Sequence, residues 1–102
     1  MNADVFRQLA LALPDVVEGQ HQGHPDFRVG GKVMATLGPE GAWAMVKLPP
    51  DAQADLVEHP SGVAEPFAGA WGKAGCTRVM LEGAPKALVR DALAKARRFV
   101  GG

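Results

Sequence analysis

With 102 residues, the chain is long enough for one domain with a single core and too short for two, so we expect residues 1–102 to form one domain. Its eleven basic side chains balance eleven acidic ones, which excludes a nucleic-acid binder that relies on overall charge and leaves only local patches. No apolar run approaches the roughly 18 residues of a membrane helix. No signal-peptide pattern precedes Leu13, and the single Cys76 excludes an internal disulfide, so we expect a cytoplasmic protein.

The amino-terminal segment predicts a helix. Asn2 is a suitable N-cap, and Pro14 disfavours helical geometry at the residue before it, so the helix is expected to end near Leu13. Apolar residues recur there at helical spacing: Val5, Phe6, Leu9, Ala10 and Leu13. Residues 15–24, with two glycines among polar residues, predict a short edge strand and a loop.

Two strands joined at Gly30-Gly31 follow, because apolar and polar residues alternate over 26–29 and over 32–37. A two-residue loop would place Val29 opposite Lys32. A three-residue loop, Gly30-Gly31-Lys32, pairs Val29 with Val33 and Phe27 with Ala35 instead. We expect the three-residue loop, because it keeps apolar residues on one face and because glycine readily supplies the positive φ of such hairpins.

The turn-rich residues Gly38-Pro39-Glu40-Gly41 lead into a third strand. If these residues form the loop, the apolar face pairs Leu37 with Ala42, Ala35 with Ala44 and Val33 with Val46. The opposite face then carries Thr36 beside Trp43 and Met34 beside Met45, with Lys47 near the strand end. We call this second surface the open face, because we expect the helices to cover the apolar one.

The rest of the chain predicts a short helix from Pro49 to Pro60, mostly loop over 61–75, a strand over 76–81 and a helix after Pro85. Cys76, Arg78 and Met80 alternate with Thr77, Val79 and Leu81, which places the first three on the open face. The order α-β-β-β(-β)-α-β-α predicts an α+β domain with helices packed on one face of an antiparallel sheet.

Several segments follow one another in the order Leu13-Pro14, the run from His24 to Lys32, Lys47-Leu48, Trp71-Gly72-Lys73-Ala74-Gly75 and Thr77-Arg78-Val79-Met80-Leu81, before a basic terminal helix. In this order and spacing they resemble the MmcQ/YjbR family of small bacterial proteins. The resemblance spans nearly the whole chain. It implies a CyaY/frataxin-like fold, and DNA binding through hairpin "wings" is one function that it suggests. The sequence departs from the family pattern at Cys76, where a large aromatic residue is expected.

No catalytic or metal-binding constellation is recognisable. His21, His24 and Asp26 are competent ligands, but they lack a second ligand pair nearby, so we expect no metal. Cys76 lacks a recognisable His partner, and Gly30-Gly31 lacks the Lys-Ser/Thr of a phosphate loop. We therefore expect a binding domain that is not an enzyme and holds no cofactor.

The open face is the candidate working surface, and three interpretations of it are left. The residues 61–75 fold back and place Phe67 or Trp71 over it as a second small core; it binds a protein or a second copy of the chain; or it binds nucleic acid. A small-molecule pocket beside Trp71 is a further alternative. The terminal helix adds Lys86, Arg90, Lys95, Arg97 and Arg98, which suit either a solvated face or DNA-backbone contacts. The candidate contacts for nucleic acid or a protein partner are Arg28, Lys32, Trp43, Lys47, Trp71, Lys73 and Arg78.

Overall fold

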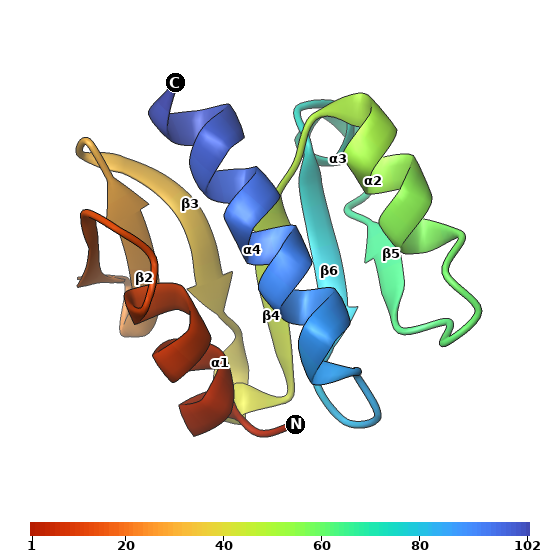
Figure 1. The fold of residues 1–102 in the computed structure, drawn as a ribbon, viewed down its shortest axis with the longest axis horizontal. Helices are drawn as coiled ribbons and strands as arrows, with labels where there is room; N and C mark the ends of the chain where they lie inside the picture. Colours follow the sequence, from red (N-terminus) through yellow and green to blue (C-terminus); the bar gives the residue numbers. More distant parts are fainter.

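The computed structural model describes residues 1–102 and contains one six-stranded antiparallel sheet in the order β1-β2-β3-β4-β6-β5. Helices α1, α4 and α2 lie side by side on one face of this sheet (Figure 1). The predicted α+β class is confirmed. No helix combines the length and the apolarity needed to cross a membrane. The elements are α1 (Ala3–Leu11), β1 (Val16–His21), β2 (His24–Val29), β3 (Lys32–Leu37), η1 (Pro39–Gly41), β4 (Trp43–Lys47), α2 (Pro50–Val57), β5 (Ala64–Pro66), α3 (Gly69–Lys73), β6 (Cys76–Met80) and α4 (Lys86–Gly101).

The two long helices form where the apolar spacing predicts them. In α1 the Asn2 side chain accepts a hydrogen bond from the backbone N–H of Val5, and the helix ends at Leu11, two residues before the predicted end. Pro85 caps α4, which lies against β3 and β4. The core lies between these helices and the sheet, and an edge-to-face contact of 5.8 Å joins Phe6 of α1 to Phe27 of β2.

The β2–β3 hairpin differs from the prediction near its turn. Val29 lies opposite Lys32, so the loop consists of Gly30 and Gly31 alone, and the expected three-residue loop is wrong. Both glycines have positive φ, of 60° and 80°, as a type I′ turn requires. Such turns match the twist of the flanking strands, which explains why the shorter loop is stable here.

A β-bulge at Met34 then brings the hairpin back into the expected register. Arg28 lies opposite Val33 and Phe27 opposite Ala35, so Met34 is the extra residue of β3. Met34 and Ala35 are both fully buried, whereas Val33 is half-buried and lies outside the core. The predictions that Met34 lies on the open face beside Met45 and that Val33 faces Val46 are therefore wrong.

The β3–β4 connection is longer than expected, and this shifts the strand register without exchanging the two faces. The pairs are Ala35 with Val46, Thr36 with Met45 and Leu37 with Ala44. The connection contains the short η1 turn, where Glu40 and Gly41 have positive φ. Because the shift is an even number of residues, Trp43 and Met45 stay on the open face and Ala44 and Val46 stay in the core.

Residues 61–75 contain two short elements that the sequence does not predict. Strand β5 pairs with β6 and forms the second edge of the sheet, and α3 follows it directly. Gln53 of α2 holds this region in place, because its amide donates to the Gly72 carbonyl at 3.1 Å and to the Thr77 hydroxyl at 3.0 Å. A Cβ at position 72 would collide with the Phe67 carbonyl oxygen, so only glycine allows this close approach.

Candidate binding cleft on the open sheet face

Strands β4 and β6 build the centre of the open face. Trp43 lies opposite Met80, Met45 opposite Arg78, and Lys47 opposite Cys76, so these six side chains share one face as the alternation predicts. The opposite sides of the same strands carry Ala44, Val46 and Val79 into the core. The hydrophobic core therefore sets the register that brings these six residues together.

The residues that follow β5 fold back onto this face and form a cleft. Phe67 meets Trp43 edge-to-face at 5.9 Å, and α3 brings Trp71 to the same place. The cleft has a volume of about 270 Å³ and is lined by Thr36, Trp43, Met45, Phe67, Trp71 and Cys76. Trp71 is 71% exposed, so the residues that follow β5 cover the open face only in part. The rim of the cleft at Trp71 stays accessible to a flat apolar group. A cleft thus lies beside Trp71, where the sequence left a small-molecule pocket as one alternative.

Arg78 packs against two aromatic residues of the cleft without lining the cleft itself. Its guanidinium carbon lies 5.1 Å from the Trp43 ring centroid and 4.6 Å from that of Phe67, within the range of cation–π contacts. Its Nη1 also donates to Glu65 of β5 at 3.0 Å. Arg78 thus helps to hold the Trp43 and Phe67 rings in place, and Glu65 balances much of its charge.

Arg28 also faces outward on this side of the sheet, but it is held in an ion pair and does not line the cleft. Its guanidinium donates to both carboxylate oxygens of Asp26, each at 2.9 Å. These hydrogen bonds, followed by the negative charge of Asp26, raise the pKa of Arg28. Gly19 on the neighbouring strand leaves room for the pair, because a Cβ there would lie 2.8 Å from Asp26 Oδ1.

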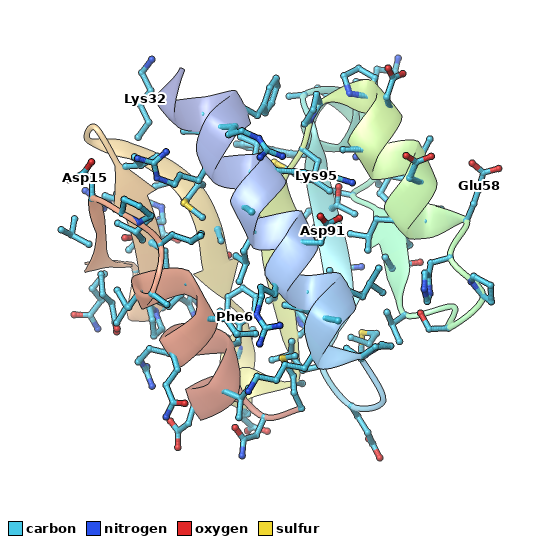
Figure 2. All side chains as sticks on the ribbon, in the orientation of Figure 1. Phe6, Asp15, Lys32, Glu58, Asp91 and Lys95 are labelled. Atoms are coloured by element: carbon cyan, nitrogen blue, oxygen red, sulfur yellow. The ribbon has the colours of Figure 1, made fainter.

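The three lysines among the candidate residues form no ion pair. Lys47 lies beside the cleft, opposite Cys76, and Lys73 ends α3, the helix that carries Trp71. Lys32 projects at the hairpin tip near the carboxyl end of α4 (Figure 2). Lys32 and Lys47 line a second depression of about 450 Å³ with Phe99 and Val100. Lys47 and Lys73 therefore bring free positive charge near the cleft, whereas Lys32 lies at the second depression.

The basic terminal helix does not extend this surface. Helix α4 lies on the other side of the sheet from the cleft, and part of its charge is balanced. Lys95 pairs with Asp91 at 2.9 Å (Figure 2), and Arg97 contacts Asp15 and the Pro14 carbonyl. Most of α4 is thus separated from the cleft, whereas the tip of the β2–β3 hairpin lies near the carboxyl end of α4, as the depression shared by Lys32 and Phe99 shows.

Cys76 is buried at the floor of the cleft, and its burial raises the pKa of the thiol, although the charge of Lys47 opposes this. A thiol with a raised pKa is a weak nucleophile at neutral pH. His21 and His24 are paired next to the β1–β2 turn, and His59 contacts Ser61. No group of three His, Cys, Asp or Glu side chains lies close enough to hold a metal ion.

The sequence interpretation missed the roles of Asp26, Glu65 and Thr36. The first was detectable, because residues two apart on a strand face the same way and Asp26 and Arg28 have opposite charges. The Glu65 contact was hidden, since β5 was predicted as loop. Thr36 was placed on the open face, beside Trp43 instead of Met45, but the cleft that it lines exists only because Phe67 and Trp71 fold back onto this face.

A comparison with protein families gives one match: the family model YjbR matches residues 11–99. The matched segment begins at the last residue of α1 and contains all strands of the sheet, α2, α3 and most of α4. No curated protein and no solved structure matches the chain significantly. Because the family match covers most of the chain and every element that builds the cleft, the chain belongs to the YjbR family, in agreement with the resemblance noted from the sequence.

Proposed function

We propose that this YjbR domain acts by binding, without catalysis, and that its ligand is single-stranded nucleic acid held with one base in the aromatic cleft. The observation that carries the proposal is the position of Trp43, Phe67 and Trp71 around one open cleft, beside the unpaired Lys47 and Lys73. Aromatic side chains next to cations are the usual combination for binding unpaired bases together with their phosphates.

The geometry favours a single strand over a duplex. A base can enter a narrow apolar cleft only if it is unstacked and unpaired, and exposed Trp71 offers it a ring face at the rim. Stacking on an aromatic side chain contributes about 1–3 kcal/mol per base. The phosphates would lie along Lys47, Lys73 and Lys32, since Arg28 and Arg78 are already paired with Asp26 and Glu65.

The raised pKa of the Cys76 thiol supports binding over thiol catalysis. A nucleophilic cysteine normally needs an environment that favours the thiolate, and burial here disfavours it. The remaining lining of the cleft is apolar except for the Thr36 hydroxyl. Such a lining suits the holding of a planar ring and contains no general base for a reaction.

A fluorescence anisotropy titration with a labelled mixed-sequence oligonucleotide, single-stranded or duplex, tests the proposal. We expect salt-sensitive binding that prefers the single strand, because each phosphate contact releases counterions. Trp71→Ala should weaken binding roughly 5- to 100-fold, and Lys47→Glu should weaken it and flatten its salt dependence. Lys86→Glu, the same charge change at the start of α4, is the matched control and should bind like the wild type.

Absence of binding at low salt, or a Trp71→Ala variant that binds like the wild type, would refute the proposal. Equal affinity for duplex with a loss in Lys86→Glu would indicate instead that α4 contacts DNA. Because Trp71 and Lys86 are both exposed, neither substitution is expected to affect folding, and a thermal melt checks this.

A protein partner at the same face is the second candidate, and the exposure of Met80 and Trp71 favours it. Trp71 is 71% exposed and Met80 is 43% exposed, so this face presents large apolar side chains to solvent. The salt dependence separates the two candidates. An apolar protein interface would hold at high salt, whereas phosphate contacts would weaken.

A further inference from the structure

Strand β1 forms a free edge of the sheet, and its main chain has an unpaired side. It pairs only with β2, through a two-residue turn in which Gln22 and Gly23 have positive φ. In such a hairpin the closing pair, His21 with His24, exchanges its hydrogen bonds inside the hairpin, and alternate residues along the strand do the same. The N–H and C=O groups of Glu18 and Gln20 therefore point away from β2 into solvent.

The devices that normally protect a sheet edge are missing from β1. Its sequence, VVEGQH, contains no proline and no lysine, and its pairing with β2 is regular over all six residues. The edge at β5 is different, because β5 has three residues and ends in Pro66. Val17 of β1 is 60% exposed on the open face. Of the two edges, β1 therefore offers the longer unpaired main chain to another strand.

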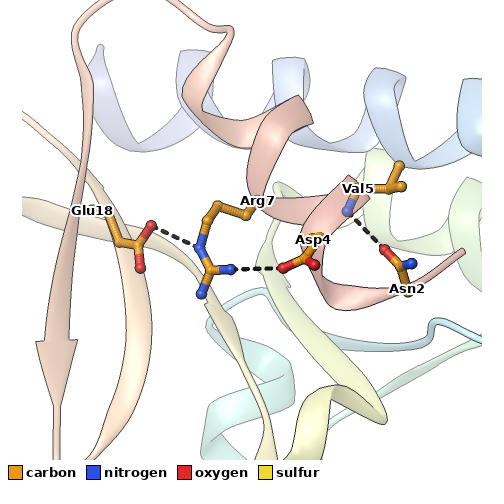
Figure 3. Close-up of polar contacts among 5 residues, drawn as sticks. All are labelled: Asn2, Asp4, Val5, Arg7 and Glu18. Carbon is orange, nitrogen blue, oxygen red and sulfur yellow. Dashed lines mark hydrogen bonds and ion pairs between the residues drawn. The ribbon is translucent and has the colours of Figure 1, made fainter.

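The one carboxylate of β1 is turned away from the edge. Arg7 of α1 reaches across to Glu18, with Nε 2.9 Å from Oε1, and the same guanidinium contacts Asp4 at 3.2 Å (Figure 3). The contact draws the Glu18 side chain toward α1 and offsets its charge only in part, because Arg7 is shared with Asp4. Negative charge therefore remains beside β1, and the residue placed opposite Glu18 affects the pairing.

We propose that β1 pairs antiparallel with β1 of a second copy of this chain, with Gly19 opposite Gly19 of that copy. Val16 points outward by the same alternation, but its N–H already donates to the Leu13 carbonyl. The free outward groups of Glu18 and Gln20 therefore decide the register, and these residues must oppose each other or themselves. A pairing centred on Glu18 would place two carboxylates opposite each other, which is unfavourable. A pairing centred on Gln20 would place Glu18 opposite Gln22, which lies in the turn.

The register centred on Gly19 places Glu18 opposite Gln20 in both halves of the pair. It uses every outward hydrogen-bonding group of these two residues and opposes no like charges. The open faces of the two copies then lie on the same side of one continuous sheet, because edge pairing extends a sheet without turning it over. The pairing itself does not depend on what the cleft binds.

Such a dimer is expected to be weak and reversible. A contact made mainly by a pair of six-residue strands falls below the roughly 1,000 Å² that stable interfaces bury. Association should therefore appear as a concentration-dependent rise in mass toward the millimolar range, with rapid exchange. A second copy fits this edge better than an arbitrary strand, because the antiparallel register complements itself.

Sedimentation equilibrium over a concentration series, with two opposite substitutions at exposed Gln20, tests the register. Gln20→Glu places carboxylates opposite Glu18 twice by symmetry and should weaken the dimer roughly 2- to 30-fold. Gln20→Lys places a cation opposite Glu18 twice and should leave the dimer as strong or stronger. Gln8→Glu makes the same charge change on the exposed surface of α1 and should have no effect.

Three results would overturn the proposal. They are a monomer mass at every concentration, an equal loss of dimer in Gln20→Glu and Gln20→Lys, or a dimer that dissociates in Trp71→Ala and is unchanged in Gln20→Glu. The last result would place the contact on the open face instead. Since nucleic-acid binding is measured separately with Trp71→Ala, failure of the edge pairing leaves the proposed function intact.

Discussion

The Arg28 guanidinium donates two hydrogen bonds to the Asp26 carboxylate, with both N–O distances at 2.9 Å. The Asp26 side chain is fully buried beneath it. The pair shares one strand face, so the arginine covers the carboxylate and separates it from solvent. A buried carboxylate without its partner would be strongly unfavourable. The pair therefore explains why a charged residue stands in the middle of β2.

Arg28→Met should lower the free energy of unfolding, because it leaves Asp26 buried without a hydrogen-bond donor. The double variant Asp26→Leu/Arg28→Met should recover much of the loss, since it removes the buried charge together with its partner. Urea denaturation of the wild type, Arg28→Met and the double variant measures the three free energies of unfolding. If the double variant were less stable than Arg28→Met, the ion pair would contribute more to stability than the neutralisation of the buried Asp26 charge.

Met34→Ala should destabilise the protein by about 2–5 kcal/mol, because Met34 is fully buried and its truncation leaves a cavity. Met45 lies on the open face and is only half-buried, so Met45→Ala should destabilise the protein clearly less than Met34→Ala. Comparing the two by denaturation tests the bulge directly. If Met45→Ala were the more destabilising substitution, Met34 would lie on the open face after all.

Gly31→Ala should destabilise the β2–β3 hairpin by about 1–2 kcal/mol, since a residue with a Cβ is strained at a φ of 80°. Gly30→Asn should be much better tolerated, because asparagine is favoured at the first position of a type I′ turn. No atom lies near the position of an added Cβ at either glycine, so the effect isolates backbone strain from crowding. Thermal unfolding of both variants gives the comparison.

Stability should fall at alkaline pH because of Cys76. Burial raises the pKa of its thiol in the folded protein, so the folded state keeps the proton at pH values where the unfolded chain has lost it. Stability is therefore unaffected below the ordinary thiol pKa of 9.0 and decreases as the pH rises above it. In Cys76→Ala this decrease should be absent.

Denaturant unfolding of wild type and Cys76→Ala from about pH 8 to about pH 10 measures the difference. Lys47→Met should raise the folded-state thiol pKa further, because the charge of Lys47 favours the thiolate. The decline should still begin at the ordinary thiol pKa, but it should extend to higher pH and become larger. An identical pH dependence in wild type and Cys76→Ala would contradict the assignment to this thiol.

The sequence predicts the fold class and most elements because the patterns that specify them are local. Alternation in β4 and β6 and helical spacing in α1 and α4 each reflect one face of one element against the core. For the same reason Trp43, Met45, Lys47 and Arg78 are placed on the correct face, even though the β3–β4 register is off by two residues. When the register between two strands shifts by an even number of residues, each side chain stays on the same face of the sheet.

The features that the sequence does not predict depend on contacts between distant segments. Met34 reads as an ordinary outward residue of an alternating strand, and only the core reveals it as a bulge. Strand β5 and helix α3 are short, and they depend on β6, Gln53 and the glycine at position 72. The cleft forms only when all of these contacts are made. The sequence therefore indicates the residues of the cleft but not its shape.

The bulge at Met34 has a consequence for the length of β3. Removal of this residue would leave Val33 opposite Arg28 and Ala35 opposite Phe27 in an unbroken ladder, with every other side chain on its present face. The hairpin therefore absorbs the additional residue without turning a strand over. What that residue adds is one thioether side chain in the interior. The additional residue of β3 thus contributes to the filling of the core and is not needed for the geometry of the turn.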